Sequence, residues 1–304
     1  MNAPAGPEGS ATGRVVAGTA VVGAFVSWGL FPIFFKAMEH VPSTEIVAHR
    51  FVWTALVLAA ALTFLGRWAK VLRVLGDRRL ALALLASSFT LSVNWVVFIW
   101  AVVDGRVVDT SLGYFGSPLA SVVLGVVLLK ERLNPWQWLA VGLAGAAVVN
   151  MIVGAGTLPW VSLTLAIVWS FYGFLRKLTP VDAIDGLFVE TLVLTPPAIA
   201  YLLWLAAVGA GNFGHGDGAT DLLIVSSGIV TAIPLCCYAF AARRLRLVTL
   251  GIFQYITPTL TFLLGVFLYN EPFDGTKQIT FALIWLALIV YTADAIRVGR
   301  RKSA

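Results

Sequence analysis

Long apolar segments alternate with short polar segments along almost the whole chain. A helix needs about 20 mostly apolar residues to cross a bilayer, and a backbone in lipid must pair its polar groups within its own segment. The pattern therefore predicts ten transmembrane helices joined by short loops. We place these helices at residues 16–35, 46–66, 80–103, 109–129, 135–153, 158–175, 186–209, 220–242, 248–269 and 278–296.

The composition strengthens this interpretation. Of the 304 residues, 59% are hydrophobic and 12% are charged, and the mean hydropathy is +0.90. A soluble domain carries about 25% charged residues, so lipid must cover most of this surface. The composition therefore excludes a soluble enzyme, a disordered chain and a nucleic-acid-binding domain, although the net charge is +6.

The positive charges predict which ends of the helices face the cytoplasm. If the N-terminus is cytoplasmic, 17 of the 21 Lys and Arg residues lie in cytoplasmic segments and 3 lie in external loops. Cytoplasmic loops are enriched in Lys and Arg, so we expect both termini in the cytoplasm. Residues 1–14 are expected to form a disordered tail, and residues 298–304 a basic cytoplasmic tail.

One basic loop also has helical spacing. Trp68, Val71, Leu72 and Leu75 recur at the intervals of one helical face, which indicates a short helix lying on anionic lipid. The alternative is an ordinary basic loop.

Two segments of the chain are similar at a shift of 140 residues. Residues 115–131 (FGSPLASVVLGVVLLKE) align without a gap with residues 255–271 (YITPTLTFLLGVFLYNE). A second match, at a shift of 141, pairs residues 28–36 with residues 169–177. The chain is thus divided into two repeats of five predicted helices each.

The odd number of helices in each repeat has a topological consequence. The second repeat must insert upside down relative to the first, and inverted repeats characterise secondary transporters. The predicted fold class is therefore an all-α membrane protein whose ten transmembrane helices form two inverted five-helix repeats. We place the first repeat at residues 15–153 and the second at residues 154–297.

Several motifs resemble those of a known family. The segments Pro118…Glu131 and Pro258…Glu271 are similar to the EamA repeats of the drug/metabolite transporter superfamily. Residues 45–50 (EIVAHR), 94–102 (NWVVFIWAV) and 111–115 (SLGYF), together with residues 244–255, narrow the resemblance to the bacterial RarD-type proteins. The resemblance covers about residues 16–297 and implies a multi-pass permease of the bacterial cytoplasmic membrane.

Two ionisable residues lie side by side in the second predicted helix. Charged groups inside a membrane are costly and usually functional. Arg50 is a candidate for binding an anionic part of a solute, because its guanidinium pairs with carboxylate or phosphate, and His49 is a candidate because it titrates near neutral pH. The alternative is a pair at the outer interface, tied to Glu45.

Glu190 is the candidate for proton coupling. It lies inside the seventh predicted helix and aligns with His49 at a shift of 141, and a carboxylate in a membrane can load and release a proton. The alternative is a structural contact with Arg176 or Lys177. The sequence leaves open whether Arg50 and Glu190 belong to one site or to two gates.

The remaining candidates are polar, aromatic and proline residues. Asn94 and Trp95 lie near the middle of the third predicted helix, and either line a cavity or pack between helices. Pro118 and Pro258 are expected in the middle of their helices, where each proline frees the carbonyl four residues earlier. These carbonyls belong to Tyr114 and Gln254, which we include with Tyr255 as candidate solute-binding residues.

The sequence thus favours a secondary transporter for a small organic metabolite or drug, working by proton-coupled export. An intramembrane enzyme and a passive channel are the alternatives. Since no P-loop and no Gly-x-Ser-x-Gly element occurs, we expect no enzymatic activity. We expect no cofactor, metal or nucleic-acid partner, and the expected partners are the solute, the lipid bilayer and protons. Oligomeric state, solute and transport direction are left open.

Overall fold

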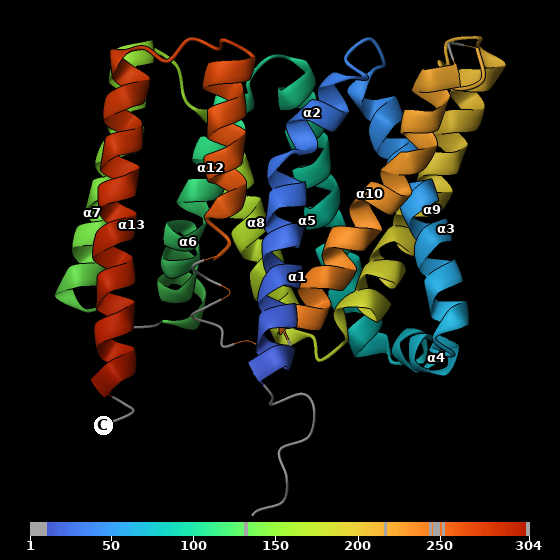
Figure 1. The fold of residues 1–304 in the computed structure, drawn as a ribbon, viewed down its shortest axis with the longest axis horizontal. Helices are drawn as coiled ribbons and strands as arrows, with labels where there is room; N and C mark the ends of the chain where they lie inside the picture. Colours follow the sequence, from blue (N-terminus) through green and yellow to red (C-terminus); the bar gives the residue numbers. More distant parts are fainter. Residues whose placement is uncertain are drawn as a thin grey trace, which may run out of the picture.

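The computed structural model describes residues 11–130, 133–215, 218–242, 245, 250 and 253–301. Every regular element in this part of the chain is a helix (Figure 1). The elements are α1 Ala11–Gly29, α2 Phe31–Lys36, α3 Ser43–Phe64, α4 Trp68–Gly76, α5 Arg78–Val103, α6 Val107–Leu129, α7 Pro135–Ala155, α8 Trp160–Leu178, α9 Ala183–Ala207, α10 Gly218–Ala242, α12 Ile256–Leu263, the π-helix η2 Leu264–Leu268, and α13 Gly275–Arg301.

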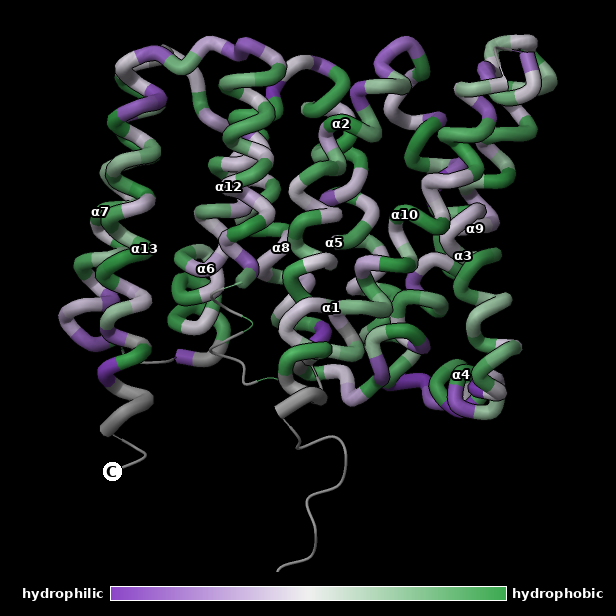
Figure 2. The backbone as a smooth tube through the Cα atoms, in the orientation of Figure 1, coloured by the Kyte–Doolittle hydropathy of each residue, from purple (hydrophilic) through white to green (hydrophobic). Residues whose placement is uncertain are grey.

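The long helices have the length and composition of membrane spans. In the described part of the chain, eight helices are long and apolar enough to cross a bilayer, with α1 and α2 together forming the first. Two further apolar helices, Trp160–Arg176 and Ile256–Leu268, are shorter. They occupy the segments predicted at 158–175 and 248–269. Figure 2 shows apolar residues along the helices and many of the hydrophilic residues near their ends.

The helices are arranged side by side, so that their connections lie at two opposite ends of the bundle. Figure 1 shows that α1 begins and α13 ends at the same end, where α4 also lies. We call this the terminal end of the bundle, and the opposite one the distal end. The basic loop around Arg73 therefore lies at the terminal end, as the distribution of positive charge predicts.

The predicted helix in this loop is present as α4. Only part of its apolar surface is free. Val71 and Val74 are buried, and the ring of Trp68 meets Phe188 of α9 edge-on at 5.3 Å. Leu72 and Leu75 are exposed, so the apolar face of α4 is shared between the bundle and its surroundings.

The helix contacts follow a paired pattern. α6 packs on α8, and α1 packs on α12. α5 packs on α8, and α1 packs on α10. Likewise α3 packs on α10, and α5 packs on α9. In addition, α3 packs on α9 and α7 packs on α13, so each of these helices contacts its own equivalent in the other predicted repeat. Exchanging the helices of one predicted repeat for their equivalents in the other therefore maps each of these contacts onto another contact in this set or onto itself.

The ends of α6 and η2 share a rare backbone conformation. Lys130 and Asn270 have φ of 54° and 52°, and they are the non-glycine residues with positive φ in the described ranges. A residue in this region ends a helix, and the two positions differ by the repeat shift of 140 residues. The next residue, Glu271, accepts backbone N–H bonds from Val107 at 2.6 Å and Val108 at 2.8 Å. This carboxylate therefore caps the first turn of α6.

Candidate functional site

Helix α3 carries the first candidate residues and is anchored at its distal end. Glu45 lies in the first turn, is buried, and accepts N–H bonds from Asn212 at 2.7 Å and from Phe213 at 3.2 Å. The loop between α9 and α10 is thereby held over α3. His49 lies one turn further along, and its ring packs on Phe213 with 4.8 Å between centroids.

Arg50 points into an aromatic and polar environment. Its guanidinium carbon lies 3.8 Å from the centre of the Trp95 ring, with Phe31 and Phe35 at 5.4 and 5.2 Å. Its Nε donates a hydrogen bond of 2.9 Å to Thr231 of α10. Only 3% of Arg50 is exposed. Arg50 and its neighbour His49 therefore have separate surroundings.

The charge of Arg50 is only partly compensated. None of the carboxylates in the described ranges lies within ion-pair distance of it, and its Nη1 has no hydrogen-bond partner. A cation–π contact contributes about 0.5–2 kcal/mol, whereas burying an unpaired ion costs several kcal/mol. An anion at this position would remove most of that cost.

Asn94 and Trp95 on α5 are brought next to Arg50. The Tyr114 hydroxyl of α6 donates to Asn94 Oδ1 at 3.2 Å, while Asn94 Nδ2 has no partner. Trp95 also stacks on Phe51 with centroids 5.1 Å apart, so its two faces meet different groups. Tyr114 is close enough to Arg50 for an electrostatic interaction. Arg50, Asn94, Trp95 and Tyr114 thus form one cluster.

A cavity of about 320 Å³ lies between α6 and α8. This volume is within the range of small-molecule sites. The residues that line it in the described part of the chain are all uncharged: Ser117, Pro118, Ser121, Leu124, Gly125, Trp169, Ser170, Gly173, Phe174 and Gln254. Tyr114 meets Trp169 edge-on at 6.0 Å, so this tyrosine connects the cavity with the cluster around Arg50.

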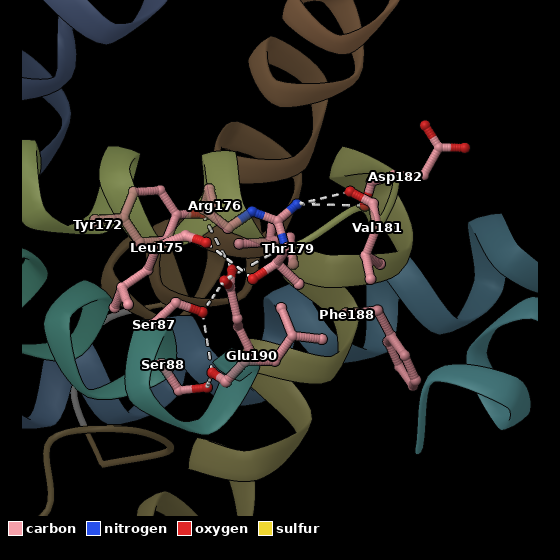
Figure 3. Close-up of polar contacts among 12 residues, drawn as sticks. Ser87, Ser88, Tyr172, Leu175, Arg176, Thr179, Val181, Asp182, Phe188 and Glu190 are labelled. Carbon is pink, nitrogen blue, oxygen red and sulfur yellow. Dashed lines mark hydrogen bonds and ion pairs between the residues drawn. The ribbon is translucent and has the colours of Figure 1, made fainter. Parts of the chain in front are cut away.

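Glu190 of α9 forms a second centre. Its side chain is fully buried and accepts hydrogen bonds from Ser87 and, at 3.1 Å, from Tyr172. Arg176 Nη1 lies 3.7 Å from Glu190 Oε1. Figure 3 shows the carboxylate among these three partners. The expected alternative contact with Arg176 is therefore present, while the side chain of Lys177 is outside the described part of the chain.

A row of rings joins the two centres. Tyr172 stacks on Trp169 with centroids 5.6 Å apart, and Trp169 in turn meets Tyr114. The contacts therefore run from Glu190 through Tyr172, Trp169 and Tyr114 to Asn94. Arg50 and Glu190 are therefore two separate centres, joined by a row of packed side chains and not by a direct ion pair.

Residues 17–153 match the EamA-like transporter family. A relative named "Uncharacterized transporter" from Vibrio cholerae serotype O1 is 43% identical over 278 residues, which cover 91% of this chain and 92% of the relative. "Protein RarD" of Streptomyces exfoliatus is 43% identical over 93% of this chain and 90% of its own. The chain belongs to the EamA-like transporter family. Within that family it is of the RarD type.

A solved structure extends the likeness to the whole fold. A crystal structure whose sequence is 22% identical aligns over 92% of this chain and 98% of its own, with a TM-score of 0.56. At this identity only the fold is comparable. The family match, the relatives and the long apolar helices together make this chain a multi-pass membrane protein of a bacterial transporter family.

The prolines of the two EamA-like segments differ in position. Pro118 lies inside α6, and the Tyr114 carbonyl accepts a 2.9 Å bond from the Ser117 hydroxyl. Pro258 was expected in the middle of a helix, but α12 begins at Ile256. Pro258 therefore lies in the first turn, where a missing N–H breaks no helical bond. Its carbonyl accepts a 2.8 Å bond from Ser111.

Gln254 and Tyr255 face different regions of the structure. Gln254 lines the cavity beside Pro118. Tyr255 packs against the hydrophobic cluster of α6, α7 and α13, which includes Phe115 and Phe281. Of the two, only Gln254 is thus placed near the cluster around Arg50.

Several residues around the two centres gave no clear signal in the sequence. Thr231, Ser87 and Tyr172 are ordinary residues within apolar segments and become partners only through folding. Asp182 and Asp185 form a weak acidic pair in the sequence, and both contact Arg67, with 2.7 Å between Arg67 Nη2 and Asp185. Arg176 also donates to the carbonyls of Val181 and Asp182, at 3.4 and 3.3 Å.

Proposed function

We propose that this protein is a secondary transporter that exports a small organic solute across the bacterial cytoplasmic membrane in exchange for protons. The observation that carries the proposal is the cluster of buried, incompletely paired polar groups around Arg50, next to a cavity whose described lining residues are uncharged. A structural core pairs its buried polar groups. Groups left without partners at membrane depth are expected where a solute binds.

The architecture that we propose has ten transmembrane helices in two inverted repeats, residues 15–153 and 154–297, with both termini in the cytoplasm. The paired pattern of helix contacts supports it, because exchanging the repeats maps the helix contacts named above onto one another. The matching backbone conformations of Lys130 and Asn270 support it as well. Two nearly equivalent arrangements of such repeats expose one central site alternately to each side.

The solute route that we propose begins in the cavity between α6 and α8. With the terminal end cytoplasmic, this cavity lies on the route from the cytoplasm to Arg50. Trp169 and Tyr114 lie between the cavity and Arg50 in the row of contacts. We therefore assign these two rings to the barrier that a solute passes, and Arg50, Asn94 and Trp95 to the central site.

Glu190 is proposed as the proton carrier. Its partners include two neutral donors and one cation, so either protonation state finds hydrogen bonds. Protonation would weaken the attraction to Arg176 and change the hydrogen bond from Tyr172. Because Tyr172 stacks on Trp169, this change reaches the proposed barrier through direct contacts.

The alternatives explain less of the site. An intramembrane enzyme needs a nucleophile, metal or acid–base pair facing a cavity, and among the described lining residues the serines have no base beside them. A channel needs a continuous polar path, whereas the way from the cavity to Arg50 is closed by aromatic rings. The names of the relatives also favour transport.

Uptake into everted membrane vesicles tests the proposal. Vesicles from cells that produce the protein are offered a panel of labelled metabolites, with and without a proton gradient. We expect at least one solute to accumulate in a gradient-dependent manner, and to accumulate much less with Arg50→Ala. Equal uptake in vesicles with and without the protein, for the whole panel, would contradict transport of a metabolite.

A further inference from the structure

We infer that the central site takes a small organic anion with an apolar, flat body. The inference rests on the proposed function for its physiological meaning, but anion binding can be measured without transport. The binding groups are Arg50, Thr54, Asn94 and Ser227, which we call the anion site. They are contributed by α3, α5 and α10.

The anion site holds donors that lack acceptors. Arg50 Nη1, Asn94 Nδ2, Thr54 Oγ and Ser227 Oγ have no hydrogen-bond partner, and each of these residues is at most 3% exposed. Guanidinium and amide N–H groups only donate hydrogen bonds, and hydroxyl groups can donate. An acceptor with several lone pairs, such as a carboxylate or a phosphonate, could receive hydrogen bonds from these groups together.

The four groups lie close to one another by their positions on the helices. Thr54 is one turn from Arg50, and therefore on the same face of α3. Ser227 is one turn from Thr231, whose hydroxyl accepts the bond from Arg50 Nε and donates to the Ser227 carbonyl. The fourth group, Asn94, is adjacent to Trp95, which lies under the guanidinium.

The backbones of α3 and α10 are in close contact next to Thr54 and Ser227. A Cβ atom at Gly228 would lie 2.5 Å from the carbonyl oxygen of Trp53. The glycine therefore permits a close approach that a larger residue would prevent. Thr54 and Ser227 are the chain neighbours of these two residues, which places both of their backbones at the contact between the helices.

The charge of the site favours an anion over a neutral solute. Glu45 is engaged by backbone N–H groups at the distal end, and Glu190 is engaged by Ser87, Tyr172 and Arg176. Neither is therefore available to Arg50. A neutral or cationic solute would leave the guanidinium charge uncompensated, whereas a carboxylate pairs with two of its N–H groups.

The side chains around the anion site indicate what the apolar part of the ligand is like. The faces of the Trp95 ring already meet Arg50 and Phe51, so the ring offers its edge to a ligand, and Phe31 and Phe35 flank the guanidinium. The route through the cavity passes Trp169 and Tyr114. These aromatic side chains would contribute binding energy to a ligand with an aromatic or alicyclic body, and little to a strongly hydrated ligand.

Ligand binding to the purified full chain in nanodiscs tests the inference. The probes are benzoate, phenylphosphonate and cyclohexanecarboxylate, with benzamide and benzylamine as neutral and cationic counterparts and chloride as an inorganic anion. We expect at least one of the three acids to raise the melting temperature and to bind reversibly, and the amide and amine to bind at least tenfold more weakly.

Variants assign the binding to the anion site. Arg50→Gln should abolish it, and Arg50→Lys should weaken it severalfold because it keeps the charge and loses the planar fork. Thr54→Val should also weaken it severalfold without changing the shape. Thr280→Val is the matched control, because the buried Thr280 hydroxyl is already bonded to Thr276 and Asn150; acid binding should be unchanged.

Each other outcome has a defined meaning. No binding of any of the three acids, equal binding of benzamide or benzylamine, or acid binding that survives Arg50→Gln would overturn the inference. So would stabilisation by chloride that the acids do not exceed. Arg50-dependent acid binding without any gradient-driven uptake would keep the anion site and overturn the transport proposal. Gradient-driven uptake of amines alone would keep the transport proposal and overturn the anion site.

Discussion

Tyr172 donates a hydrogen bond of 3.1 Å to Glu190, and the two residues come from neighbouring helices, α8 and α9. The same tyrosine ring stacks on Trp169, which lines the cavity. A single residue thus contacts both the candidate proton carrier and the candidate barrier. This relationship makes the coupling proposal open to direct test.

Tyr172→Phe removes the hydrogen bond to Glu190 and keeps the stacked ring. A hydrogen bond to a charged group contributes about 1.5–3 kcal/mol, so we expect proton-driven accumulation to fall by about tenfold or more. Exchange between equal solute pools should change little. Accumulation and exchange are measured in proteoliposomes. Unchanged accumulation in Tyr172→Phe would show that coupling does not pass through this contact.

Glu190→Gln keeps the shape of the side chain and removes its titration. We expect this variant to lose gradient-driven transport and to retain exchange between equal pools, as measured by pH-dependent counterflow. Glu39→Gln is the control, because Glu39 is an exposed carboxylate paired with Lys36. If Glu190→Gln keeps full proton-driven accumulation, Glu190 is a structural partner of Arg176 instead.

The orientation of the bundle is testable with two cysteines. In a background with Cys236 and Cys237 replaced by serine, Gly211→Cys at the distal end should react with an impermeant thiol reagent added to intact cells. Arg73→Cys, which lies on α4 at the terminal end, should react only after the membrane is opened. Labelling of Arg73→Cys in intact cells would reverse the proposed topology.

Pro118→Ala and Pro258→Ala should differ. Alanine at 118 supplies an N–H for the Tyr114 carbonyl, which then competes with the Ser117 hydroxyl and stiffens α6 beside the cavity. We expect transport to fall severalfold while the amount of inserted protein stays normal. Pro258→Ala adds an N–H in the first turn of α12, where the N–H groups have no carbonyl partner within the helix. This variant should transport nearly as well as wild type. Equal rates in both variants would remove Pro118 from the transport route.

Glu271→Ala should destabilise the protein. Its carboxylate accepts two backbone N–H bonds at the start of α6, and leaving buried donors unpaired costs about 1–3 kcal/mol. We expect a lower melting temperature in detergent. Asp274→Asn is the control, because Asp274 caps only the exposed start of α13. Burial raises the pKa of Glu271, and the N–H groups of Val107 and Val108 oppose that rise. Melting temperatures that match wild type would show that this cap is dispensable.

The apolar pattern predicted the helices well, because lipid leaves the backbone few alternatives. All ten predicted segments contain helix within the described residues. The break before Ile256 was missed, because Gln254 and Tyr255 do not interrupt an apolar run. The π-helix at the end of that segment was also missed; it contains Gly265, which lies close to Val108 of α6, a contact that no local pattern reports.

The candidate site was predicted in part. Arg50 and Glu190 were found because a charged residue inside an apolar segment is conspicuous. Asn94 was found because a polar amide in the middle of such a segment is also conspicuous, and Trp95 because it is the neighbour of Asn94. The sequence does not predict that His49 packs on Phe213 while Arg50 meets Trp95, because adjacent helical residues point in different directions. Partners such as Thr231 and Tyr172 depend on contacts between helices that are distant in the chain.

The close contact at Gly228 limits how the protein can move. Helices α3 and α10 touch backbone to backbone there, and Gly113 permits a similar approach of α6 to Ser162 of α8. Each pair is therefore expected to travel as a rigid body, since separating its members would open a void along the contact. Arg50 and Thr231 then move together, and the plane of sliding passes between the two pairs. Trp95 belongs to α5, which packs mainly on α8 and less on α3, so the contact between Arg50 and the Trp95 ring crosses that plane and is the one that sliding would change.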